Sequence, residues 1–259
     1  MTEAAWLPNL LTDDAGAALR AEGGGVVTTL PPAGAVPSAG RFEGLYGALY
    51  DRVIQDDRLR RLAPIAYGDA GPVTDLDAFV RKVAAQTTPR RGRRVPVLLD
   101  VPSGGGTLLP RLAAEGYAGR VIAADLGVAM LSRARGVAAR TPALDVALLR
   151  ADATALPLAD EAVDAAVSLN GLHVMPDPRV FLLELGRVVR PRGKLWLVTL
   201  VSHGSRRADA IVLAGRLTGI LPGAPPTRPT LLRWLADAGF ATPAPLGGAG
   251  LVGITAIRR

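Results

Sequence analysis

The sequence predicts a doubly wound α/β fold with a mostly parallel sheet. From residue 95 onward, short apolar runs alternate with stretches of helical spacing. The apolar runs carry hydrophobic residues at consecutive positions, which indicates strands that are buried on both faces and covered by helices. The first run ends in three glycines, Gly104, Gly105 and Gly106, at the turn into a helix. Such turns lie at the edge where open parallel sheets bind ligands.

The elements of this region follow one another in a regular order. Strands are expected over 95–101, 120–126, 144–152, 162–170, 194–201 and 251–259, and helices over 107–116, 127–140, 178–190 and 228–240. Gly116 and Gly239 fall where two of the helices should end, because glycine readily adopts the left-handed conformation of a helix terminus. The Pro- and Gly-rich stretch at 202–230 interrupts the alternation and is interpreted as a lid-like insertion.

Three regions are expected along the chain. They are a loop-rich leader at 1–40, a helical cover at 41–90 and an α/β core at 91–259. The leader is rich in Gly, Pro and Ala, with a short hairpin expected around residues 26–30. The cover has apolar residues at helical spacing over 42–63 and 74–86, and Thr74 or Asp75 is expected to cap the second helix.

Composition excludes several classes of protein. The chain has no cysteine, which rules out disulfides, thiolate zinc sites and cysteine nucleophiles. His173 and His203 are the two histidines of the sequence, so no metal site is expected. The N-terminus lacks the basic and apolar segments of a signal peptide, and no apolar run of about 18 residues could span a membrane. We therefore expect a cytoplasmic protein.

The net charge of +7 is compatible with nucleic acid as a partner. The basic residues are nearly all arginine and are scattered along the chain, with one cluster at 89–96. We interpret that cluster as a solvated linker before the first strand rather than as a nucleic-acid contact. A small-molecule partner is therefore favoured, and a homodimer is left open.

The glycines need a physical reason because each one costs backbone entropy. They allow the turn to pass close to a ligand, but the third glycine of the dinucleotide fingerprint is a leucine here, which disfavours a pyrophosphate. Asp125 ends the next strand about 20 residues later, where an acid binds ribose hydroxyls. Asp152, followed by Ala153, ends the third strand, where an acid suits an adenine amino group.

Four segments together resemble the ordered motifs of the class I S-adenosylmethionine-dependent methyltransferases, in particular the quinone and small-molecule methylases. They are LLDVPSGGGT, AADLGVAMLSRAR, RADATALPLADEAVDAAVSLNGLHVMPDP and LLELGRVVRPRGKLWLVTLV. The resemblance covers roughly residues 95–200. It implies a Rossmann-like methyltransferase fold with a seven-stranded sheet whose last strand is antiparallel, and S-adenosylmethionine as the cofactor.

The resemblance also implies a role for individual residues. It implies that the methionine end of the cofactor is bound by Asp100, Ser103, Gly104, Gly105 and Gly106, and that Tyr50 caps its carboxylate. It implies that Asp125 binds the ribose and that the adenine is bound by Leu126, Met130, Asp152 and Ala153. It implies that Leu169 and Asn170 line the sulfonium end. The sequence departs from the family's pattern at Pro102-Ser103, where the family has cysteine or glycine, and at Arg192, where it has glycine.

The two histidines are the candidates for a general base. His173 follows the fourth core strand and His203 the fifth, both at the edge where the methyl group should emerge. A lone histidine is nevertheless more often a structural residue than a catalytic one. Asp160 and Asp164 are interpreted as turn and packing residues.

The expected reaction is in-line displacement of a methyl group from the sulfonium, for which positioning is the main requirement. A base is needed only when the acceptor is protonated. We expect a small or medium, largely apolar acceptor, with Arg206 or Arg207 meeting any acidic group on it. An RNA methyltransferase, and a descendant of the fold that binds the cofactor without methylating, are the alternatives.

Overall fold

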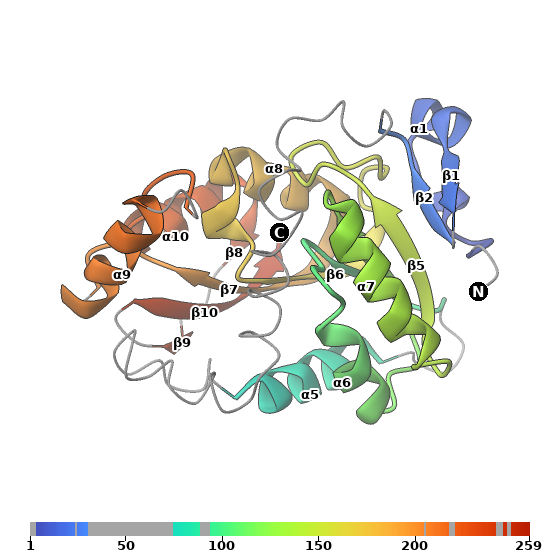
Figure 1. Ribbon diagram of the computed structural model, residues 1–259, viewed down its shortest axis with the longest axis horizontal. Helices are drawn as coiled ribbons and strands as arrows, with labels where there is room; N and C mark the ends of the chain where they lie inside the picture. Colours follow the sequence, from blue (N-terminus) through green and yellow to red (C-terminus); the bar gives the residue numbers. More distant parts are fainter. Residues whose placement is uncertain are drawn as a thin grey trace.

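The computed structural model of the protein describes residues 4–23, 25–30, 75–88, 94–204, 206–217, 221–241, 246–247 and 250–259. Figure 1 shows a twisted sheet with helices against its faces. The doubly wound α/β fold with a mostly parallel sheet is confirmed. Among the described residues, no helix combines the length and the apolar character needed to cross a membrane.

The sheet runs in the order β1-β2-β5-β4-β3-β6-β7-β10-β8, and β9 pairs with β10. The strand bounds are β1 (Arg20–Gly23), β2 (Val26–Thr28), β3 (Val97–Asp100), β4 (Arg120–Asp125), β5 (Asp145–Arg150), β6 (Val163–Leu169), β7 (Val189–Leu200), β8 (Phe240–Ala241), β9 (Leu246–Gly247) and β10 (Leu251–Arg258). The strands from β2 to β7 pair in parallel, whereas β10 is antiparallel to β7 and β8. The carboxyl ends of β3, β4 and β5 therefore meet at one edge.

The number of strands differs from the seven expected. In the described part of the chain the sheet has ten strands. The additions are the hairpin β1–β2, which extends the sheet beyond β5, and the two-residue strand β9. The hairpin lies at 20–28 rather than around 26–30. The described part of the leader is thus built into the sheet.

Helices cover both faces of the sheet (Figure 1). Their bounds are η1 (Pro8–Leu10), α1 (Asp13–Ala18), α5 (Leu76–Thr87), α6 (Leu108–Ala114), α7 (Val128–Ala139), η4 (Leu172–Val174), α8 (Pro178–Val188), α9 (Arg206–Leu217) and α10 (Arg228–Asp237). Buried side chains of α8 and α10 join the core on one face, and those of α5 and α6 the core on the other. The cap of α5 is Asp75, whose carboxylate accepts the amide of Ala78 at 2.8 Å.

The N-terminal segment is fastened to the outer strand β5. Trp6 is buried and donates its indole N–H to Asp145 at the start of β5, at 2.8 Å. Leu11 forms an isolated bridge with Leu158, and Leu7 packs in the core. These contacts join residues far apart in sequence, and periodicity alone could not predict them.

Two boundaries differ from expectation for local reasons. α8 ends at Val188 and β7 begins at once, so the strand starts five residues before the expected residue 194. The early part of β7 is held by Asp164, which accepts from Arg190 at 2.6 Å. α9 lies inside the insertion at 202–230 and was not predicted, because the Pro and Gly content of that stretch indicated a break in the α/β alternation. The expected helix at 42–63 falls outside the described residues.

Candidate cofactor site

Three acidic residues stand at the ends of three neighbouring parallel strands. Asp100 ends β3, Asp125 ends β4, and Asp152 follows β5 by two residues. Since these strands are adjacent in the order β5-β4-β3, the acids share one edge of the sheet. The amide of Ala151 donates to the carbonyl of Asp125 at 3.0 Å, which ties two of the strand ends together. Sequence reasoning brought these acids to one edge, and the fold agrees.

The glycine turn after β3 adopts a left-handed backbone. Gly104 has φ 53° and Gly106 has φ 82°. A Cβ on Gly106 would lie 3.1 Å from the Cα of Ala134 in α7 and 3.3 Å from its Cβ. The glycine at 106 is therefore required by the backbone conformation and by α7, which comes close to the turn. The sequence attributed the glycines to a ligand, and for Gly106 the structure adds this packing reason.

Two polar atoms at this turn are buried without a hydrogen-bond partner among the described residues. They are Oδ2 of Asp100 and Oγ of Ser103. Asp100 is 2% exposed, and burial, together with the neighbouring charge of Asp125, raises the pKa of its carboxyl well above the usual range. Buried polar atoms are nearly always satisfied in folded proteins, so an orphaned pair beside a glycine turn fits a ligand that supplies donors. A cofactor with an ammonium group meets that requirement.

Asp125 already has two backbone partners. Its Oδ2 accepts the amide of Gly104 at 2.8 Å, and its Oδ1 accepts the amide of Gly127 at 2.9 Å. The carboxylate thus holds the turn after β3 against the start of α7. The ribose role of Asp125 stays a prediction.

The four residues expected around the adenine are buried or half-buried. Asp152 uses Oδ1 to accept the amide and the hydroxyl of Thr154, at 2.8 and 2.7 Å. Met130 and Ala153 are buried, and Leu126 is half-buried. The backbone amide of Ala153 donates to none of the described residues, so it is available to a ring nitrogen. Binding of adenine by these residues stays a prediction.

The loop after β6 lies directly against the glycine turn. A Cβ on Gly171 would be 2.2 Å from Cδ of Pro102 and 2.9 Å from Oγ of Ser168. Leu169 and Asn170, expected at the sulfonium end, are half-buried, and the amide of Asn170 donates to Val198 at 2.8 Å. The fold thereby brings the expected methionine and sulfonium ends together. Tyr50, expected at the cofactor carboxylate, lies outside the described residues.

The two histidines have different surroundings. His173 is buried, and its Nδ1 accepts the amide of Leu200 at 3.3 Å and lies 3.1 Å from Oγ1 of Thr199. Burial lowers the pKa of this imidazole to about 4. Because Nδ1 is an acceptor, the neutral ring carries its proton on Nε2. His203 is exposed, and its amide donates to Asp209 of α9 at 2.8 Å.

Sequence reasoning missed one ion pair beside the site, between a buried arginine and a glutamate at the surface. Arg150 is fully buried; its Nη1 donates to Glu22 at 2.5 Å and its Nε to the carbonyl of Leu126 at 3.3 Å. It connects the N-terminal hairpin to the loop after Asp125. The sequence shows an arginine at the end of an apolar strand, LDVALLR, but nothing in it indicates that Glu22 is the partner of this arginine.

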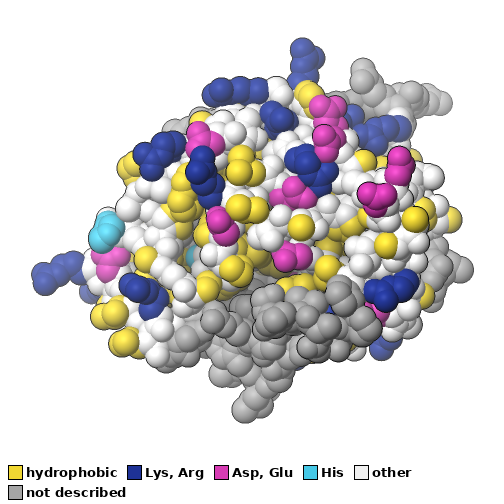
Figure 2. Space-filling model, turned by 90° about the horizontal axis from the view of Figure 1, so that it is seen from above, with side chains coloured by type: hydrophobic (Ala, Val, Ile, Leu, Met, Phe, Trp, Pro, Cys, Tyr) yellow, Lys and Arg dark blue, Asp and Glu magenta, His cyan; other side chains and the backbone are white. Residues whose placement is uncertain are grey.

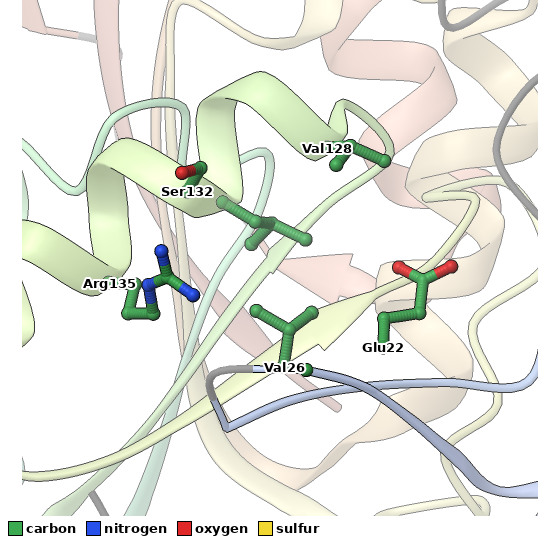
Figure 3. Close-up of a pocket in the computed structure, with 7 residues that line it drawn as sticks. Glu22, Val26, Val128, Ser132 and Arg135 are labelled. Carbon is green, nitrogen blue, oxygen red and sulfur yellow. The ribbon is translucent and has the colours of Figure 1, made fainter.

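Glu22 also lines a small pocket between the hairpin and α7. The pocket has a volume of about 130 Å³ and includes Val26, Val128 and Arg135. Figure 3 shows Glu22 and Arg135 on opposite sides of the pocket, with Val26 between them.

The acidic residues that were interpreted as structural are indeed in ion pairs. Asp160 accepts from Arg187 at 2.8 Å. Asp164, which is buried, binds Arg94 at 3.1 Å and accepts the amide of Val97 at 2.8 Å. Arg94 belongs to the arginine cluster, so at least this member has an acidic partner within the chain. Residues 89–93 of the cluster lie outside the described residues.

The sheet order, the glycine turn and the acids at successive strand ends define a Rossmann-like methyltransferase fold. A methyltransferase domain model matches residues 99–197, the stretch from β3 to β7. The geranyl diphosphate C-methyltransferase of Streptomyces coelicolor A3(2), solved with Mg²⁺, geranyl diphosphate and S-adenosyl-L-homocysteine, has a similar fold. Its TM-score is 0.57 at 15% identity, over 71% of this chain and 81% of that one.

Two curated relatives extend the similarity beyond this stretch. The demethylmenaquinone methyltransferase of Clavibacter sepedonicus is 32% identical over 219 residues, 77% of this chain and 83% of the relative. That of Renibacterium salmoninarum is 29% identical over 205 residues, 68% of this chain and 82% of the relative. The chain belongs to the class I S-adenosylmethionine-dependent methyltransferases, in the quinone methylase-like part of that family. It is therefore a methyltransferase that uses S-adenosylmethionine.

Proposed function

We propose that this protein transfers the methyl group of S-adenosylmethionine to a small or medium, largely apolar acceptor of the quinol or phenol type. The observation that carries the cofactor part is the buried, unpartnered pair of Asp100 Oδ2 and Ser103 Oγ at the glycine turn. The acceptor class is supported by the names of the relatives, which are demethylmenaquinone methyltransferases.

The residues at the strand ends divide the cofactor between them in this proposal. Asp100 and Ser103 bind the ammonium and carboxylate end, since their atoms there have no other described partner. Asp125, at the end of β4, binds the ribose hydroxyls. Asp152 and the amide of Ala153 meet the adenine edge. When bound, the cofactor supplies a methyl group already activated by positive sulfur.

The chain's contribution to the chemistry is to position the acceptor and to exclude water. His173 does not serve as the base, because its Nδ1 is occupied by the amide of Leu200 and its pKa of about 4 makes it a poor proton acceptor. An acceptor that is already ionised at neutral pH, such as an acidic quinol or phenol, needs no base. His203 is exposed and stays a candidate for contact with the acceptor.

The proposal is tested in two stages. Calorimetry with S-adenosylhomocysteine should show binding to the unaltered protein and strongly weakened binding to Asp125→Ala. Asp77→Ala, which removes an exposed acid on α5, is the matched control and should bind normally. Methyl transfer from labelled cofactor is then measured with demethylated quinols, simple phenols and RNA. Lack of cofactor uptake would refute the site, and transfer to RNA alone would refute the acceptor class.

A further inference from the structure

The outward face of α9 has an unusual composition. The helix turns two described buried residues, Ala208 and Val212, toward the protein. On the opposite side, Arg206, Ala210, Leu213 and Leu217 are all exposed and follow one another at spacings of four, three and four, which places them in one stripe along the helix. Leu213 is 55% exposed and Leu217 is 80% exposed, the two highest values among the large exposed hydrophobic residues described.

A surface helix of a water-facing protein normally places polar residues opposite its packed face. In α9 the outward stripe begins with Arg206 and is apolar after it, and the other polar residues lie beside the stripe. Arg207 and Arg216 are exposed on either flank of the stripe. The ion pairs between described residues include none of Arg206, Arg207 and Arg216. The one acid of the helix, Asp209, accepts the amide of His203. The stripe is therefore apolar with basic flanks.

Figure 1 places α9 at one end of the molecule, and Figure 2 shows dark-blue basic side chains beside yellow hydrophobic ones at that end. The chain as a whole carries a net charge of +7. Both the local flanks and the overall charge favour a negatively charged partner.

We propose that α9 docks on an anionic lipid surface. The leucines enter the boundary between headgroups and acyl chains, and the arginines bind the lipid phosphates, as in interfacial amphipathic helices. A second copy of the chain fits this face less well. Two leucines and one alanine bury far less than the roughly 800 Å² per partner of a stable protein interface, and two copies would bring like charges together.

Docking through α9 also orients the proposed site. α9 follows β7, whose carboxyl end lies at the same edge of the sheet as Asp100 and Asp125. A lipid surface at α9 therefore lies on the side of the molecule where the acceptor should enter. The entry of the acceptor from the lipid side rests on the proposed function, because it requires an apolar acceptor. The docking of α9 on lipid does not require it.

The test is flotation of the full chain with vesicles of equal parts phosphatidylglycerol and phosphatidylcholine, compared with phosphatidylcholine alone. We expect binding to the anionic vesicles that exceeds binding to the neutral ones by at least about tenfold. The double variant Leu213→Ser with Leu217→Ser should lose at least about tenfold in binding, since its apolar stripe is gone. Arg207→Gln with Arg216→Gln should weaken the preference for anionic lipid, because it removes two of the positive charges beside the leucines.

The control is Val180→Thr with Leu183→Ser on α8, two hydrophobic residues that are also exposed, at 39% and 42%, but lack this arrangement of arginines. It should bind vesicles like the unaltered chain. Circular dichroism and S-adenosylhomocysteine binding verify that each variant is folded, and neither measurement depends on methyl transfer. If the leucine variant binds anionic vesicles undiminished, the attraction is charge alone and the proposal is wrong. If that variant instead turns a dimer into a monomer, as measured by light scattering, the face is an interface between copies.

Discussion

Asp100→Asn should make the free protein more stable and the cofactor bind more weakly. The Asp100 carboxyl is 2% exposed, and its Oδ2 has no described partner. A buried polar group without a partner costs about 1–3 kcal/mol, and more when it is charged. Asparagine keeps the shape and cannot ionise, so the variant avoids the charged form. A gain of about 1–3 kcal/mol in the free energy of unfolding is expected at alkaline pH.

The direction in which this stability difference changes with pH follows from the raised pKa of the Asp100 carboxyl. The unfolded chain releases the proton near pH 4, whereas the folded protein holds it to a higher pH. Between these two values the unfolded state is favoured progressively as the pH rises. The stability advantage of Asp100→Asn should therefore be small at about pH 4 and should grow as pH increases through the folded pKa.

Cofactor binding should respond in the opposite direction. A cationic amino group favours the ionised carboxylate, so binding to the unaltered protein should release a proton and strengthen as the pH rises. Loss of a charge-assisted hydrogen bond of about 1.5–3 kcal/mol would weaken binding of S-adenosylhomocysteine roughly tenfold to a hundredfold in Asp100→Asn. Urea unfolding at several pH values and calorimetry in buffers of different ionisation enthalpy measure both effects.

Asp164→Asn is the matched control, because Asp164 is also buried but binds Arg94, Arg190 and the amide of Val97. It should destabilise the protein and leave cofactor affinity intact. If Asp100→Asn also destabilised the protein equally at low and high pH, and bound the cofactor normally, the reasoning about the unpartnered carboxyl would be refuted.

Three further changes test other parts of the structure. Gly106→Ala places a Cβ in a left-handed, crowded turn and should lower both the melting temperature and cofactor affinity, whereas Gly16→Ala, with open space around it, should stabilise α1 by up to about 1 kcal/mol. His173→Gln should flatten the loss of stability on acidification from pH 6.5 toward about 4, worth up to about 3 kcal/mol, as followed by urea unfolding, and should leave the shape of the pH–rate profile unchanged. Glu22→Gln removes a charge partner of the buried Arg150 and should cost about 1.5–3 kcal/mol and weaken cofactor binding, whereas Trp6→Phe, which removes the bond to Asp145 at the start of β5, should affect stability alone.

The core of the fold could be predicted because its signals are local. The strands β3 to β6 and the second half of β7 are apolar runs, and the turns between them carry residues such as Gly116, whose φ of 64° glycine adopts without a steric clash. The acids at the strand ends follow from the parallel order once the strands are placed. These features depend on a few neighbouring residues, which the sequence displays directly.

The rest depended on contacts between distant segments. Nothing near Glu22 indicates that it faces Arg150, and nothing near Trp6 indicates Asp145, because the hairpin joins the sheet only through three-dimensional packing. The helix α9 escaped prediction for a related reason. Its apolar residues lie on both sides of the helix, with Ala208 and Val212 inward and Leu213 and Leu217 outward, so the sequence shows no single apolar face.

The same edge of the sheet unites the cofactor site with α9. The unpartnered atoms of Asp100 and Ser103 lie at the end of β3, and α9 follows the end of β7, two strands away through β6. A cofactor carrying charge and an acceptor carrying apolar surface need opposite environments. Buried carboxylates beside a glycine turn provide the first, and an exposed leucine stripe bordered by arginines provides an approach from lipid for the second. If α9 docks as proposed, leucine-to-serine changes there should slow methylation of a lipid-dissolved acceptor and leave methylation of its short-chain, water-dissolved counterpart unchanged.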